Sequence, residues 1–178
     1  MSTAIPSSAQ PAIPAELQEI IDDFQAMTEP ERLELLLEFS RSLPELPSRL
    51  ADHPEMLEQV VECQSPLFLT VEAGESPEHP VELFFSAPPE APTTRGFAGV
   101  LHEGLNGLSA AEILAVPADV PDRLGLTRAI TPLRMRGMSA MLGRIKRKVA
   151  EQLAAGSAGS AGSAGSEATG TTVADAAG

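Results

Sequence analysis

The sequence predicts an α+β domain in which helices cover one side of a small antiparallel β-sheet. Apolar residues recur at helical spacing in the first third of the chain and again near its end. Between these regions, the segments PLFLTVEAG (66–74) and VELFFSA (81–87) alternate their side chains as strands do. The segment GESPEHP (74–80) joins them and is rich in turn-forming residues. The two segments are therefore expected to form a β-hairpin.

Two helices and a further short one are predicted before this hairpin. Pro14 fits the first turn of a helix, and an apolar face follows it at Leu17, Ile20, Ile21 and Phe24. Thr28 and Glu31 have the spacing of a capping box, which predicts a second helix. The segment LPELP (43–47) ends that helix, and HPEMLEQV (53–60) predicts one further short, turn-rich helix.

Three helices are predicted after the hairpin. Residues 94–107 form one that ends at Asn106-Gly107, and Ser109 with Glu112 repeats the capping-box spacing for a short second one. Pro132 begins a last helix, whose apolar stripe is formed by Met135, Met138, Met141, Leu142, Ile145 and Val149. The methionines are interpreted as core residues.

These elements place one domain at residues 14–154, which is long enough to bury a core. Residues 1–13 are expected to be flexible. Residues 155–178 are a near-repeat of Ala, Gly and Ser and are expected to be disordered, because no side chain there can offset the entropy of ordering. The N-terminus lacks a secretory pattern and no segment approaches ~20 apolar residues, so we expect a cytoplasmic protein without membrane contact.

Composition limits the chemistry. The formal net charge of −13 disfavours nucleic acid as a partner, because phosphate contacts need a positive local potential. Cys63 is the single cysteine, so the chain alone forms no disulfide and no Cys-based zinc or Fe–S site. His53, His79 and His102 are not spaced as ligands on one element, so no metal site or resident cofactor is predicted. RIKRK (144–148) is interpreted as solvated cations near a helix C-terminus.

Cys63 is the candidate reactive residue. It lies in VVECQSPLFLTVEAG (60–74), where a polar loop meets the first predicted strand. A thiol on such a loop can be presented to a partner, and its thiolate is the reactive form. Glu62 disfavours that thiolate, whereas Gln64 and Ser65 can form hydrogen bonds around the sulfur. From the residues alone, an inert Cys63 that acts as a small apolar side chain remains an alternative.

Three segments resemble the SufE family, also called the Fe–S metabolism-associated family. The first is VECQS (61–65), with LPELP upstream of it. The second is TRGFAGVLHEGLNGLSAAEIL (94–114), which is similar to the family's helix with a basic residue and a glycine near its start. The third is LGLTRAITPLRMRGMSAMLGRIK (124–146), which resembles the C-terminal block. The resemblance extends over residues 14–150 in the expected order.

The resemblance implies a SufE/IscU-like fold and a role in sulfur transfer. A pyridoxal-phosphate-dependent cysteine desulfurase (SufS-type) would hold sulfur as a persulfide, and the thiolate of Cys63 would accept that sulfur. The chain would stimulate the desulfurase and pass the sulfur to an Fe–S scaffold. The chain would then be an accessory protein without enzymatic turnover of its own, and the cofactor would belong to the desulfurase. Arg134 is a candidate contact for the anion or the partner, and Arg95 is a weaker one. A weak homodimer is compatible with the sequence.

The chain departs from the family pattern near its cysteine. Glu62 stands where the family usually has Gly, and Ala129 replaces a common histidine. Leu133 replaces a small polar residue beside Arg134, while Arg134 and Gly137 are kept. These departures leave the expected fold unchanged and concern the surroundings of the thiol.

Three other functions are alternatives to sulfur transfer. An Fe–S scaffold or metal-binding module is disfavoured by the single cysteine, because such sites need several soft ligands. A cysteine enzyme such as a peptidase or thiol transferase would need a base near Cys63. A structural interaction domain would leave Cys63 inert. Metal titration, turnover without a partner and alkylation of the native thiol distinguish these alternatives.

Overall fold

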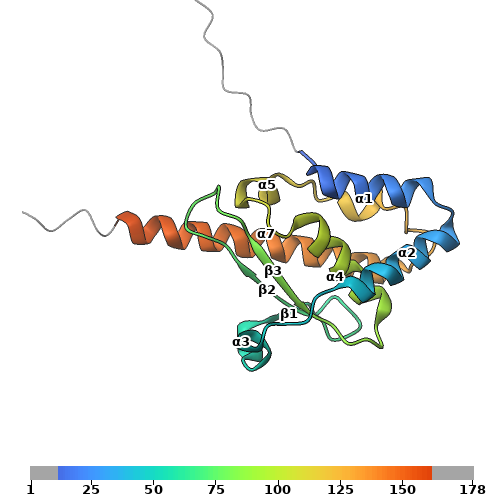
Figure 1. Ribbon diagram of the computed structural model, residues 1–178, viewed down its shortest axis with the longest axis horizontal. Helices are drawn as coiled ribbons and strands as arrows, with labels where there is room; N and C mark the ends of the chain where they lie inside the picture. The colour runs from blue at the N-terminus through green and yellow to red at the C-terminus, as the bar shows by residue number, and fades with distance from the viewer. Residues whose placement is uncertain (1–11, 162–178) are drawn as a thin grey trace, which may run out of the picture.

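The computed structural model describes residues 12–161 and combines seven helices with a small sheet over that range (Figure 1). The helices are α1 (Ala15–Ala26), α2 (Glu29–Ser42), α3 (Ser48–Ala51), α4 (Pro92–Leu105), α5 (Ala110–Ala115), α6 (Val120–Arg123) and α7 (Pro132–Ala161). A single 3-10 turn, η1 (Pro54–Met56), precedes the strands β1 (Glu58–Gln59), β2 (Phe68–Glu72) and β3 (Glu82–Ser86). The expected α+β class is confirmed. Within residues 12–161, no helix combines the length and apolarity required to cross a bilayer.

The sheet has the order β1-β2-β3 and is antiparallel throughout. Leu69 pairs with Phe85 and Val71 pairs with Leu83, and all four side chains are buried on one face. This confirms the expected hairpin. Strand β1 was not predicted, because a two-residue edge strand is too short to show alternation. The helix predicted at 53–60 is reduced to the turn η1, after which the chain pairs with β2.

Helices α4 and α7 cover the buried face of the sheet. Figure 1 shows α7 passing behind the hairpin along the length of the molecule. The stripe predicted for α7 is buried, including Met135, Met138 and Met141. The opposite face is half-buried, and there the guanidinium of Arg49 on α3 lies 5.1 Å from the ring centroid of Phe84. The main helical layer is therefore on one side of the sheet, as expected.

Helix α4 lies directly against α2 because two of its residues have no side chain. A Cβ at Gly96 would lie 2.5 Å from the carbonyl oxygen of Leu36, and one at Gly99 would overlap the carbonyl of Phe39. Between these helices, Arg95 is largely buried, and its guanidinium donates to backbone carbonyls of Ser40 (2.8 Å), Ala87 (2.7 Å) and Leu43 (3.2 Å). These three bonds account for an arginine at the start of a helix.

Both capping boxes and the predicted end of α4 are present. The backbone N–H of Thr28 donates to the Glu31 carboxylate at 2.7 Å, and that of Ser109 donates to the Glu112 carboxylate at 2.9 Å. Gly107 has φ +84°, the left-handed conformation that favours glycine after a helix. The chain reverses there and returns toward α5.

Helix α7 continues past residue 154, where the domain was expected to end, as far as Ala161. Its far half is tied to the hairpin, because Gln152 accepts from the N–H of Ala73 at 2.7 Å and donates to the carbonyl of Val71 at 2.6 Å. A Cβ at Gly156 would lie 3.2 Å from the Cα of Glu75. Residues 1–11 and 162–178 lie outside the described residues, so the flexibility and disorder expected there stay predictions.

Candidate functional site

Cys63 lies on a short loop, residues 61–66, between β1 and β2. The ends of this loop form a neck, in which the N–H of Val60 donates to the carbonyl of Leu67 at 2.8 Å. Both of these residues are fully buried and anchor the neck in the core. Inside the loop, the N–H of Cys63 donates to the carbonyl of Val60 at 3.1 Å and makes a tight turn. The loop therefore projects one cysteine from a fixed base.

The thiol is turned toward the first half of α7. A Cβ at Gly137 would lie 2.9 Å from the Sγ of Cys63. That separation is shorter than ordinary van der Waals contact, so any side chain at residue 137 would compete with the sulfur for space. The glycine at residue 137 is thus what allows the thiol to rest against the helix.

A pocket of about 170 Å³ opens beside the thiol. Its wall on the loop side is Cys63, Gln64 and Ser65, and its other walls are residues 90–94, Phe97 and Arg134. The guanidinium of Arg134 donates to the hydroxyl of Thr93 at 3.3 Å. The structure therefore brings Cys63 and Arg134 to one pocket, although they are far apart in the sequence.

The surroundings of Cys63 favour the neutral thiol. Burial is the largest cause and the neighbouring Glu62 carboxylate the second, and together they raise the pKa of Cys63 from 9.0 to about 11. The guanidinium of Arg144 acts in the opposite direction by attraction to the thiolate. Cys63 is nevertheless only half-buried, so the sulfur is partly screened from water without being sealed in the core.

We expect the rate of alkylation of Cys63 in the folded protein to rise with pH around a midpoint near 11 instead of 9. The folded-state pKa lies above the unfolded value, so the neutral thiol of Cys63 makes its full contribution to the free energy of unfolding below pH 9. This contribution is lost as the pH rises toward 11. Iodoacetamide kinetics from pH 7 to 11 show whether the rate levels off above pH 9 or is still rising at pH 11. A Cys63→Ser variant, which lacks the thiol, should show less alkaline destabilisation, and a midpoint near 9 would contradict the expectation.

Basic residues of α7 hold the base of the Cys63 loop. Arg144 forms two contacts with the Glu62 carboxylate, at 2.6 and 3.2 Å, and a third with Glu58 at 3.1 Å. Arg147 and Lys148 also bind Glu58, at 2.6 and 3.1 Å. The hydrogen bond from Arg147 is the largest cause that lowers the pKa of Glu58 to about 2. The carboxylates and the cations therefore form one connected network.

This network corrects the interpretation of RIKRK as solvated cations near a helix C-terminus. The segment lies in the middle of α7, since the helix continues to Ala161. Arg144, Arg147 and Lys148 are ion-paired, and the ammonium of Lys146 donates to the carbonyl of Val116 at 2.6 Å. The sequence carried a signal for this arrangement in two acidic residues, Glu58 before the loop and Glu62 within it. Nothing in the sequence specified which cations face them.

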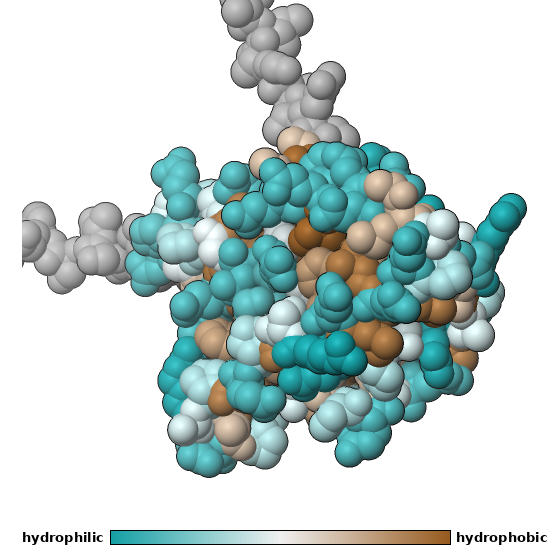
Figure 2. All heavy atoms as spheres, turned by 45° about the vertical axis from the view of Figure 1, so that its right-hand side comes forward, coloured by the Kyte–Doolittle hydropathy of each residue, from teal (hydrophilic) through white to brown (hydrophobic). Residues whose placement is uncertain are grey.

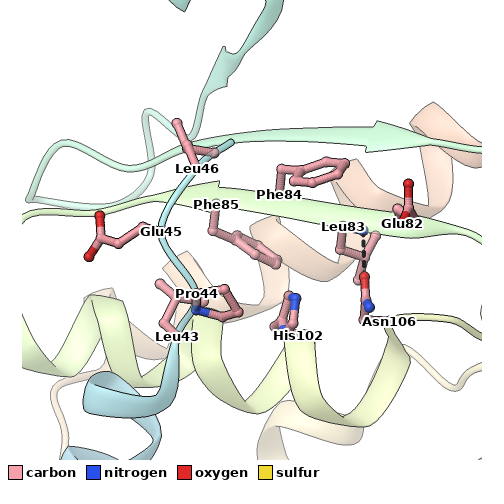
Figure 3. Close-up of a pocket in the computed structure, with 10 residues that line it drawn as sticks. All are labelled: Leu43, Pro44, Glu45, Leu46, Glu82, Leu83, Phe84, Phe85, His102 and Asn106. Carbon is pink, nitrogen blue, oxygen red and sulfur yellow. Dashed lines mark hydrogen bonds between the residues drawn. The ribbon is translucent and has the colours of Figure 1, made fainter. Parts of the chain in front are cut away.

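A second pocket, of about 100 Å³, lies between residues 43–46, β3 and α4 (Figure 3). Figure 3 shows the imidazole of His102 beside the ring of Phe85, whose centroid is 6.5 Å away, and Asn106 accepting from the N–H of Leu83. Burial lowers the pKa of His102. No thiol or arginine lines this pocket, so the Cys63 pocket is the candidate site. Within residues 12–161, no cluster of three or more His, Cys, Asp or Glu side chains could hold a metal ion.

Comparison with known proteins identifies the family. The model of the SufE domain, described as an Fe–S metabolism associated domain, matches residues 18–149. The chain belongs to the SufE family. This SufE-family chain is 54% identical over 144 residues to an uncharacterised SufE-like protein of Mycobacterium tuberculosis, with 81% of this chain and 98% of that one covered. It is 31% identical over 143 residues to an uncharacterised SufE-like protein of Rhizobium meliloti, with 78% and 98% covered.

The fold is shared with a solved structure. The solution structure of a hypothetical protein from Thermus thermophilus superposes with a TM-score of 0.70 at 35% identity, covering 80% of this chain and 99% of that one. Family membership gives this SufE-family chain a role in Fe–S metabolism. Cys63, Arg134 and Gly137, the positions that carried the resemblance, meet at one place in the structure.

Proposed function

We propose that this SufE-family chain accepts sulfur on Cys63 from the persulfide of a SufS-type cysteine desulfurase, stimulates that enzyme and passes the sulfur on for Fe–S cluster assembly. The observation that supports this most directly is the pocket in which the single thiol and Arg134 face the same space. The proposed partners are a desulfurase as donor and an Fe–S scaffold as acceptor. A cytoplasmic location, and an accessory protein without turnover of its own, belong to the same proposal.

The transfer is a thiol exchange that needs no external oxidant or reductant. The thiolate of Cys63 attacks the terminal sulfur of the donor persulfide, and the sulfur–sulfur bond in the donor breaks. The donor cysteine leaves as a thiolate, and a new sulfur–sulfur bond forms on Cys63. The proton released by the Cys63 thiol returns to the donor thiolate through solvent. One acceptor thiol suffices, since a second cysteine in the chain would displace the sulfur by closing a disulfide.

The pocket offers groups that can stabilise a sulfur anion. Helix α4 begins at its rim, and the first turn of that helix has no side-chain cap, so the N–H groups of Thr93 and Thr94 are not used within the helix. A helix N-terminus favours negative charge. The guanidinium of Arg134 adds a positive charge from α7. We therefore assign Arg134 to the stabilisation of the Cys63 thiolate or persulfide.

The decisive experiment mixes the chain with a cysteine desulfurase of the same organism and free cysteine, without reductant, and measures the intact mass. We expect one or more added sulfur atoms that dithiothreitol removes, and no gain with Cys63→Ser. Arg134→Gln, which keeps a polar side chain without the charge, is expected to slow sulfur uptake about tenfold or more. No gain in mass with a demonstrably active desulfurase would refute sulfur acceptance from that donor.

A further inference from the structure

We propose that Glu62 and Arg144 are positioning residues whose ion pair clips the Cys63 loop closed against α7 until a partner docks. The use of this clip in sulfur transfer rests on the proposed function, whereas the clip itself is a property of the free chain.

The loop contacts α7 at two points on one side of the helix. Gly137 and Arg144 are seven residues apart, which is close to two helical turns, so they face the same way. Gly137 receives the thiol, and Arg144 receives the Glu62 carboxylate in a two-pronged contact of 2.6 and 3.2 Å. Two-pronged arginine–carboxylate pairs are stronger and more directional than single contacts. The pair therefore fixes both the distance and the orientation of the loop.

Arg144 is held in place before the loop closes. Its guanidinium also bonds Glu58 at 3.1 Å, and Glu58 is itself bound by Arg147 and Lys148. The side chain of Arg144 is only 17% exposed. An arginine that is already ordered loses little entropy when it binds a second carboxylate, so this pair is worth more than two mobile surface charges.

Few other interactions oppose opening of the loop. Among the described residues, the Glu62–Arg144 pair is the one side-chain hydrogen bond or ion pair that residues 61–66 make with α7. Val61 is 69% exposed and contributes little burial. The neck at Val60 and Leu67 stays anchored in the core. The loop would therefore be released when three interactions break: the Glu62–Arg144 pair, the turn at Cys63 and the contact with Gly137. The base of the loop would stay folded.

The charged groups around the thiol make it possible to distinguish closure of the loop from a direct effect of charge on the ionisation of Cys63. Glu62 and Arg144 act on Cys63 directly, while Glu90 and Arg134 line its pocket and Glu58 lies behind Arg144. If the pair acted by charge alone, loss of Glu62 would favour the thiolate and loss of Arg144 would disfavour it. If the pair acts as a clip, loss of either residue opens the loop.

The test uses the free full-length chain with Glu62→Gln, Arg144→Gln and the double variant. Hydrogen–deuterium exchange of a peptide spanning 61–66 reports opening independently of thiol ionisation. We expect either single variant to speed this exchange about threefold to fivefold, and the double variant to be no faster than the singles because the residues act as one unit. Glu151→Gln is the matched control, since Glu151 pairs with Arg147 on the exposed side of α7 and does not contact the loop. Its exchange should equal that of the parent chain.

Alkylation of Cys63 at pH 8 is the second measurement. Glu62→Gln both opens the loop and removes a repelling charge, so we expect alkylation about fivefold to tenfold faster. Unchanged exchange in both single variants, or faster exchange in only one, overturns the clip. Neither measurement contains a desulfurase. Failure of sulfur acceptance would thus leave the clip standing, and failure of the clip would leave sulfur acceptance standing.

Discussion

Gly99→Ala is expected to lower the free energy of unfolding by about 2 to 4 kcal/mol. The new methyl group would overlap the carbonyl oxygen of Phe39, which belongs to the backbone of α2 and cannot rotate away. Helices α2 and α4 must then separate, and the close packing between them is lost. Alanine is the better helix former by about 1 kcal/mol, which offsets only part of this cost.

Urea denaturation followed by circular dichroism measures the effect. Gly143→Ala on α7 is the matched control, because a Cβ there would meet nothing within 4 Å. That variant should be as stable as the parent or more stable by up to about 1 kcal/mol. If Gly99→Ala behaved like Gly143→Ala, the close approach of α2 and α4 would be wrong.

Arg95→Met is expected to destabilise the fold by about 2 to 4 kcal/mol while roughly preserving side-chain volume. It removes charge-assisted hydrogen bonds to the carbonyls of Ser40, Ala87 and Leu43, and leaves these acceptors without their donor. Arg95→Lys should restore little of the loss, because an ammonium cannot reproduce the planar fork. Thermal melting should register a decrease of about 5 to 12 °C.

The control for this variant is Arg41→Met. Arg41 is exposed near the end of α2 and has no ion pair or side-chain hydrogen bond among the described residues. Its replacement should change stability by less than about 0.5 kcal/mol. Arg95 also anchors residues 87–95, which include the wall of the Cys63 pocket, so Arg95→Met should loosen that wall as well. Equal stability of the two methionine variants would contradict a structural role for Arg95.

Local signals predicted most of the fold. Capping boxes at Thr28 and Ser109, the apolar stripe of α7 and the alternation of the hairpin each act over a few neighbouring residues, and each is present. Strand β1 was missed because its pairing with β2 is specified by the fold and not by its two residues. Helix α7 runs to Ala161, beyond residue 154, which local composition predicts as the end of the domain; contacts of this part of the helix with the hairpin, such as those of Gln152, are not visible in local composition.

The candidate site was predictable in its residues but not in its geometry. Cys63 and Arg134 were both expected from the family motifs, and they share a pocket. The partners of Glu62 could not be predicted, since choosing Arg144 among the basic residues requires the position of α7 relative to the loop. Figure 2 shows one consequence of the fold that a sequence cannot show, an apolar patch in the middle of a face that is otherwise hydrophilic.

If Cys63 accepts sulfur as proposed, the anchored neck of its loop limits how far the thiol can reach toward a donor. Residues 61–66 leave the buried pair Val60 and Leu67 and return to it, so the fully extended tip stands roughly 10 Å from the neck. Cys63 could not reach a donor sulfur that lies in a channel deeper than this distance unless the core around the neck were distorted. Under the proposed function, the neck would therefore restrict donors to those whose reactive sulfur lies within roughly 10 Å of their surface.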